Sequence, residues 1–199
     1  MASLGSSALW YAEHGVPVFP LKPGTKRPAN VHGVTDATTD PAQIRGWWGR
    51  QPAANIGAAT GYVFDAIDID GPEGQASRAE RWCYDPACRA AGRLPQPPAW
   101  WTETCDHPGV FNRVEAVQLG KVLTPRPGGM HIYVPPGYAH DRNAARIYPG
   151  VDYRGRGGYV VAPPSVISPE WAAAEGQTAG SYVFLGLPML EPVPAGEAG

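Results

Sequence analysis

The chain has 199 residues, a length typical of one domain or of two fused ones, and it is long enough to bury a core. Hydrophobic residues make up 43% and charged residues 17%, which excludes a disordered tail and a coiled coil. No apolar run reaches the roughly 18 residues of a membrane span, and residues 1–15 lack the basic start of a signal peptide.

The net charge of −2 is unevenly distributed. Residues 22–50 hold five basic and two acidic side chains, and residues 121–158 hold six basic and two acidic ones. Between them, residues 62–85 hold six acidic and two basic side chains. Metal and polyphosphate sites need this contrast, although ordinary surface charge is the alternative interpretation. The chain as a whole is not basic, so the pattern does not indicate a broad duplex-binding face.

The first elements in chain order are a short helix capped by Ser6 or Ser7 and ended near Gly15, and then an extended edge segment from Val16 to Leu21. Further strands and one helix (Glu73 to Arg81) are expected downstream. The strands are Asn55 to Gly61, Tyr62 to Asp70, Met130 to Val134, Val151 to Arg154, Tyr159 to Ala162 and Tyr182 to Leu185. Because this order lacks regular β-α-β alternation, the sequence predicts an α+β fold.

A second helix is predicted from its start. Asp40 is a good N-cap, and Pro41 follows at the first helical position. The helix carries Trp47 and Trp48, which we interpret as core anchors, with stacking on nucleic-acid bases as the alternative.

Two aspartates end the clearest strand. Side chains alternate between the faces of a strand, so Asp68 and Asp70 point the same way while Ile67 and Ile69 face the opposite layer. Their oxygens can converge on one or two divalent ions such as Mg²⁺. A bare Asp-x-Asp is also common at solvated strand ends, so the pair alone leaves both interpretations open.

Two later segments carry further candidates. His131 follows Gly128 and Gly129, which offer close backbone approach and N–H groups to a ligand, and its side chain could donate to a phosphate; a structural histidine is the alternative. Asp152 and Arg154 share one strand face, where they would place a carboxylate beside a guanidinium suited to phosphate. The alternative there is a salt-bridged hairpin around a glycine turn.

All three cysteines fall within 23 residues. Cys83 and Cys88 form one pair, and Cys105 with His107 forms another. A Cys₃His set fits a closed structural Zn²⁺ site, whereas three unrelated reduced thiols are the alternative.

The motifs in this order make the chain resemble the bifunctional DNA primase/polymerase (prim-pol) domain of plasmid, phage and mobile-element replication proteins, in the archaeo-eukaryotic primase superfamily. The matching segments are Ala8 to Ala12, Pro17 to Leu21, Gly24 to Pro28, Asp36 to Asp40, Ile44 to Trp48, Asn55 to Gly57, Asp68 to Asp70, Gly128 to His131 and Gly150 to Gly155. The resemblance implies a two-module fold with an RRM-like catalytic half.

The resemblance also implies the site. Its acidic motifs fall on Asp68, Asp70 and Asp152, which would hold two Mg²⁺ or Mn²⁺ ions, and its histidine motif falls on His131, which would contact the nucleotide's phosphates. Arg154 and Lys26 match basic positions near the nucleotide. Relatives more often carry Ser or Thr and Arg where this chain has Pro127 and Met130.

We therefore expect a catalytic domain over residues 1–190, with a zinc-stabilised insertion at residues 82–112 like that of some relatives. Residues 191–199 would form a tail or a linker to a further region. Expected partners are a single-stranded DNA template, a primer, NTP or dNTP, and a helicase domain or protein. The chain itself is expected to be monomeric, cytoplasmic and without a membrane partner.

Two rival functions remain from the sequence. One is a metal-dependent glycosyltransferase with an Asp-x-Asp motif, which would need a Rossmann-like start and a sugar-binding half. The other is a zinc-containing single-stranded DNA-binding module without catalysis.

Overall fold

The computed structural model describes residues 3–81, 118–138, 142–186 and 188–190, and these form a mixture of helices and antiparallel sheets, as predicted. The helices are α1 (Leu4–Glu13), α2 (Pro41–Arg50), α3 (Gly71–Arg81) and α7 (Pro169–Glu175), with a 3-10 turn η1 (Gly33–Asp36). The strands are β1 (Val18–Leu21), β2 (Asn55–Ala59), β3 (Asp65–Ile69), β4 (Gly120–Leu123), β5 (Met130–Val134), β6 (Ala144–Tyr148), β7 (Val151–Arg154), β8 (Tyr159–Ala162), β9 (Val166–Ile167), β10 (Gly180–Ser181) and β11 (Val183–Phe184). None of the helices within the described ranges has the length and apolar character needed to span a bilayer.

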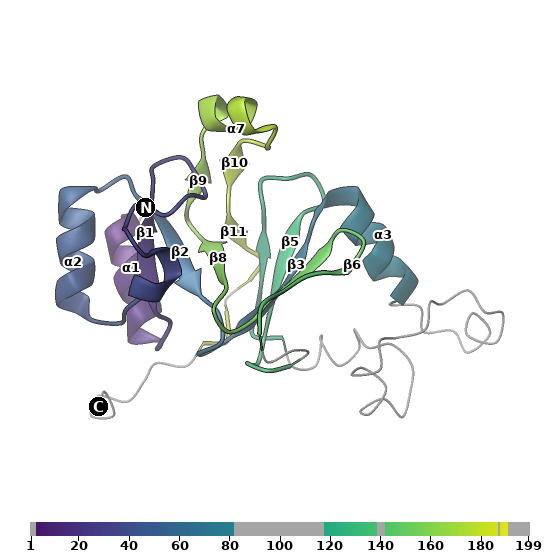
Figure 1. The fold of residues 1–199 in the computed structure, drawn as a ribbon, viewed down its shortest axis with the longest axis horizontal. Helices are drawn as coiled ribbons and strands as arrows, with labels where there is room; N and C mark the ends of the chain where they lie inside the picture. The colour runs from purple at the N-terminus through teal and green to yellow at the C-terminus, as the bar shows by residue number, and fades with distance from the viewer. Residues whose placement is uncertain (1–2, 82–117, 139–141, 187, 191–199) are drawn as a thin grey trace.

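Two main sheets stand side by side (Figure 1). The first has three strands in the order β1-β2-β8, and the second has six in the order β11-β4-β5-β3-β7-β6. Helices α1 and α2 cover the three-stranded sheet, whereas α3 lies against the six-stranded sheet (Figure 1). A small β9-β10 pair carries α7 above the space between the sheets.

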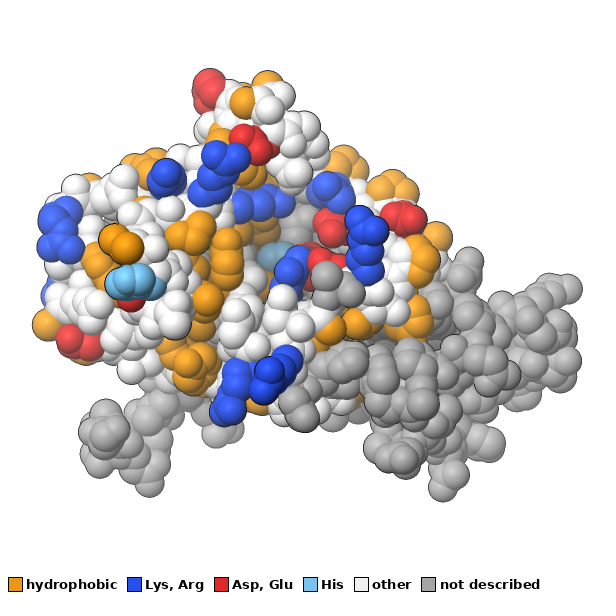
Figure 2. Space-filling model, in the orientation of Figure 1, with side chains coloured by type: hydrophobic (Ala, Val, Ile, Leu, Met, Phe, Trp, Pro, Cys, Tyr) orange, Lys and Arg blue, Asp and Glu red, His pale blue; other side chains and the backbone are white. Residues whose placement is uncertain are grey.

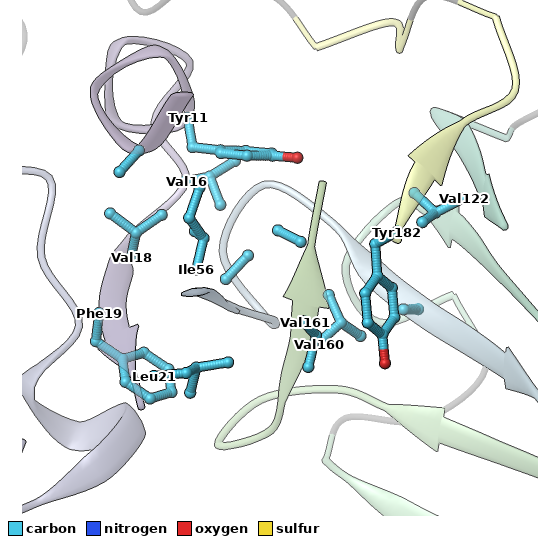
Figure 3. Packing of buried hydrophobic residues seen from close by; sticks show 14 of the residues in the cluster. Tyr11, Val16, Val18, Phe19, Leu21, Ile56, Val122, Val160, Val161 and Tyr182 are labelled. Carbon is cyan, nitrogen blue, oxygen red and sulfur yellow. The ribbon is translucent and has the colours of Figure 1, made fainter. Parts of the chain in front are cut away.

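The larger hydrophobic core joins the two sheets. Figure 3 shows Val160 and Val161 of β8 between the α1 side and the six-stranded sheet, where Val122 and Tyr182 belong to the same cluster. Trp48 is buried and donates its indole N–H to the carbonyl of Ala54 at 2.9 Å. The core-anchor interpretation of Trp48 is therefore confirmed.

A second core lies on the other face of the six-stranded sheet. It contains Ile67 and Ile69 of β3 with Ile132 and Val151 from the neighbouring strands. The alternation predicted for β3 is confirmed, because its isoleucines enter this core while Asp68 belongs to the face that looks toward the three-stranded sheet.

Of the two predicted N-caps, that of α2 is correct and that of α1 is wrong. Asp40 caps α2 and accepts the N–H of Ala42 at 2.9 Å, as predicted. The cap of α1 is Ser3 rather than Ser6 or Ser7, and its hydroxyl accepts the N–H of Ser6. Because the cap is Ser3, α1 begins at Leu4, about one turn earlier than the sequence predicted.

The chain crosses between the two sheets at two adjacent places. One crossing leads from β2 to β3, and the other leads from β7 to β8. Thr60 ties them together, because its N–H donates to Gly158 at 3.1 Å and its hydroxyl donates to Gly155 at 2.7 Å. The hairpin alternative for this segment is wrong, since β7 pairs with β3 and β8 pairs with β2.

Candidate active site

Three carboxylates gather where β3 meets β7. Asp68 lies near the end of β3, directly opposite His131 of β5 on one side and Asp152 of β7 on the other. Asp70 follows the end of β3, and its backbone N–H donates to Gly150 at 2.7 Å. Each of the three aspartates offers an oxygen within 4.8 Å of the other two. The register of three neighbouring strands therefore brings residues 84 positions apart into one cluster.

Two arginines partly neutralise this acidic cluster. Arg126 Nη1 lies 3.0 Å from Asp70 Oδ1, and Arg154 Nη2 lies 2.6 Å from Asp152 Oδ2 and 3.6 Å from Asp68 Oδ2. Burial raises the pKa of Asp70, and the charges of Asp68 and Asp152 add to that increase while Arg126 opposes it. Negative charge thus accumulates among hard oxygen donors, which is the environment that suits a divalent cation such as Mg²⁺ or Mn²⁺.

The cluster opens into a cavity of about 420 Å³ between the two sheets, within the range of small-molecule sites. Figure 2 shows the hollow on this face, with acidic and basic side chains gathered around it. Its lining includes Lys26, Asp68, Asp70, Arg126, His131, Asn143, Arg154, Tyr159, Gln177 and Tyr182. The structure therefore brings all six residues assigned to metal and nucleotide to one site, with Asp152 joined to it through the acidic cluster.

His131 lies at the floor of this cavity and is 5% exposed. Its Nε2 is 3.5 Å from Asp68 Oδ1, and its Nδ1 has no hydrogen-bond partner among the described residues. Burial lowers the pKa of His131, although the charge of Asp68 opposes this, so the ring is neutral at pH 7. A neutral imidazole offers one N–H donor and one acceptor, rather than a full positive charge.

Lys26 reaches the cavity from the loop after β1. Its ammonium donates to Gln177 Oε1 at 3.1 Å, and the hydroxyl of Tyr159 donates to its backbone carbonyl at 3.1 Å. Burial lowers the pKa of Lys26, whereas the charges of Asp68 and Asp70 act to raise it. The side chain is held in place as a cation across the cavity from the carboxylates.

The sequence did not identify Arg126, Asn143, Tyr159, Gln177 or Tyr182 as cavity residues. Arg126 sits in the turn before β5, where its carbonyl accepts the N–H of Gly129 at 2.8 Å. That N–H is therefore not free for a ligand, contrary to the prediction, and a Cβ at Gly129 would collide with Thr124. The sequence offered one indication of the role of Arg126, since this basic residue lies two positions before the Gly128-Gly129 pair.

Tyr182 is 2% exposed and lines the same cavity. No described residue forms a hydrogen bond with its hydroxyl, and burial raises its pKa, so the phenol is a neutral donor facing the site. Nothing in the local sequence distinguished it from a core tyrosine.

The zinc prediction concerns Cys83, Cys88, Cys105 and His107. All four lie outside the described residues. Zinc therefore stays a prediction from the sequence.

A family model described as bifunctional DNA primase/polymerase, N-terminal, matches residues 8–195. The chain belongs to this Prim-Pol family. No curated protein matched the chain in a separate comparison. The matched range contains every residue of the site described above, and membership supports a DNA primase/polymerase function in broad terms.

Proposed function

We propose that this Prim-Pol domain is a template-dependent nucleotidyltransferase that synthesises and extends primers by two-metal-ion catalysis, in the replication of a plasmid, phage or mobile element. The observation that carries the proposal is the convergence of Asp68, Asp70 and Asp152 within 4.8 Å, at the edge of a cavity lined by Lys26 and Arg154. We also interpret the six-stranded sheet with α3 as the RRM-like half that the family resemblance implies.

The three aspartates fit a pair of divalent cations by their chemistry. They supply hard oxygen donors, and the pKa of Asp70 is raised first by burial and then by the charges of Asp68 and Asp152, which Arg126 only partly offsets. When bound, two such ions would activate the 3′-hydroxyl and stabilise the leaving pyrophosphate. The protein's own contribution is to fix the positions of the carboxylates through the register of β3 and β7.

The basic and neutral donors of the cavity would hold the triphosphate. Arg154 can present two parallel N–H groups to phosphate oxygens, and Lys26 presents a point charge from the loop after β1. His131, as a neutral imidazole, would donate one hydrogen bond and add no charge. Together they would orient the α-phosphate toward the aspartates while the cavity walls exclude water.

The two rival functions fit less well. A glycosyltransferase of the Asp-x-Asp type would start with a parallel Rossmann-like sheet, but every strand pair in the described part of the chain is antiparallel. A non-catalytic single-stranded DNA-binding module would have no need for three convergent carboxylates, which repel a nucleic-acid backbone.

The test is template-directed primer extension with Mg²⁺ or Mn²⁺. Asp68→Asn, Asp70→Asn and Asp152→Asn should each lower kcat by about 10³-fold, because each removes an anionic ligand while preserving shape. Asp40→Asn is the matched control, since asparagine keeps the cap of α2 and the residue lies outside the cavity. Extension at the wild-type rate by any one of the three site variants, at equal folding by circular dichroism, would refute the proposal.

A further inference from the structure

A second cavity, of about 850 Å³, opens beside the acidic cluster. Its lining residues are Asp70, Glu73, Arg126, Arg146, Ile147, Tyr148, Pro149, Gly150 and Asp152. It shares only Asp70 and Arg126 with the nucleotide cavity between the sheets. The aspartates therefore border two separate spaces, and the proposed function so far uses one of them.

The wall of the second cavity is held firmly. The first turn of α3 packs backbone to backbone against the β6–β7 turn, because a Cβ on either Gly74 or Gly150 would collide with the other segment. Ser77 adds a hydrogen bond from its hydroxyl to the carbonyl of Pro149 at 2.6 Å. The cavity is thus bounded by two packed elements rather than by a loose surface loop.

Arg146 is the cavity residue with the most unusual backbone. It lies on β6, within an irregularity in the pairing of β6 with β7, and has φ +54°, in a region that non-glycine residues avoid. In this conformation its backbone N–H donates to Asp152 Oδ1 at 2.6 Å. Its side chain is exposed and lines the second cavity. One residue thus orients a carboxylate of the cluster and brings a positive charge to the second cavity.

The in-line geometry of the proposed reaction indicates which substrate this cavity could bind. The attacking oxygen and the leaving group lie on opposite sides of the reacting phosphorus. If the triphosphate occupies the cavity of Lys26, His131 and Arg154, the attacking hydroxyl must reach the aspartates from another direction. The second cavity offers that approach, since Asp70 and Asp152 line it as well.

We propose that the second cavity binds the acceptor, the 3′-terminal nucleotide of the growing strand, and that Arg146 pairs with its phosphate. This inference rests on the proposed function. The 3′-oxygen forms a bond to the α-phosphorus, the bond from that phosphorus to the bridging oxygen breaks, pyrophosphate departs, and the hydroxyl proton passes to solvent. Arg126, at the junction of the two cavities, lies between the acceptor and the incoming nucleotide.

Charge substitutions of opposite sign test the acceptor site. Arg146→Asn removes the guanidinium but tolerates a positive φ, so the KM and Kd for a primer–template should rise about tenfold, with the KM for the nucleotide unchanged. Glu73→Gln removes a carboxylate that lines the cavity, so the Kd for the primer–template should fall by about twofold to fivefold. Arg45→Asn, an exposed arginine of α2 outside both cavities, is the matched control.

Binding is measured by the fluorescence anisotropy of a labelled primer–template, which needs no catalytic turnover. Arg146→Gly, which relieves any backbone strain, should weaken primer binding as Arg146→Asn does; unchanged primer affinity in both would overturn the inference. A 4-thiothymidine at the primer's 3′ end should crosslink within residues 146–150. A crosslink within residues 22–36 instead, or a loss of nucleotide rather than primer affinity, would also overturn it.

The failure of this inference is distinguishable from the failure of the proposed function. If Asp68→Asn abolishes extension while Arg146→Asn and Glu73→Gln leave primer binding unchanged, the nucleotidyltransferase stands and the acceptor assignment is wrong. If the aspartate variants extend primers normally, the proposed function is wrong, whatever the crosslink shows.

Discussion

The two sheets border the same cavity but contribute different chemistry. The six-stranded sheet places the three aspartates and His131 by the register of neighbouring strands, which leaves little freedom of position. The three-stranded half contributes Lys26 from a loop, and side-chain hydrogen bonds from Gln177 and Tyr159 hold that loop segment. We infer that substitutions of the three aspartates change the chemical step, whereas substitution of Lys26 changes the affinity for the nucleotide.

The largest effect after loss of an aspartate is expected for Arg154→Ala. The guanidinium contacts Asp152 and approaches Asp68, so its removal should make Mn²⁺ bind about tenfold more tightly without nucleotide. The same change removes a phosphate donor, so kcat/KM for extension should fall by about 100-fold. Isothermal titration with Mn²⁺ and primer extension measure the two effects.

Arg156→Ala is the control for Arg154, because this neighbouring arginine is exposed and lies outside both cavities. If Mn²⁺ affinity and extension fell together in Arg154→Ala, Arg154 would not compete with the cation for the carboxylates.

A smaller effect, confined to affinity, is expected for Lys26→Met. Loss of the cation should raise the KM for the nucleotide about tenfold and change kcat much less, because the carboxylates keep their positions. Lys22→Met removes an exposed lysine of the same loop and serves as the control. A fall in kcat at constant KM would place Lys26 in the chemical step. That result would refute the inference that Lys26 contributes to affinity alone.

The smallest effect on activity is expected for Tyr133→Phe, at the contact between the halves. Tyr133 is fully buried and stacks on Phe64, and its hydroxyl has no hydrogen-bond partner among the described residues. Removing that hydroxyl should raise the free energy of unfolding by about 1 kcal/mol and leave extension unchanged.

The stability of the protein at alkaline pH gives a second test of Tyr133. Burial raises the pKa of Tyr133 above its ordinary value of 10, so the folded state is destabilised as the pH rises past 10, where the unfolded phenol ionises. Denaturant titrations should show a smaller loss of stability above pH 10 in Tyr133→Phe. An equal loss in both proteins would mean that this phenol is not the group responsible.

Local patterns predicted much of the fold. Strands β5, β7 and β8 begin and end where their apolar alternation indicated, and Asp40 caps α2. Helix α7 was missed, although Ser168 and Pro169 repeat the cap and proline pattern of α2. Strand β6 was missed for a physical reason, since its pairing is irregular and Arg146 departs from extended backbone.

The local sequence predicted individual site residues better than it predicted how they come together in space. The side-chain alternation of β3 correctly placed Asp68 and Asp70 on one face, but their meeting with Asp152 depends on strand pairing between distant segments. The family resemblance supplied that link. Arg126 reaches the cavity from the turn before β5, and Tyr182 reaches it from the single residue between β10 and β11; no local periodicity encodes either position.

The paired crossings at Thr60 and Gly158 have a consequence for the evolution of this domain. The two hydrogen bonds of Thr60 join these crossings, and each crossing connects the two sheets whose residues line the cavity. A residue inserted at either crossing would shift one sheet relative to the other and so move Lys26 relative to Asp68. We therefore expect insertions that preserve activity to avoid these two crossings.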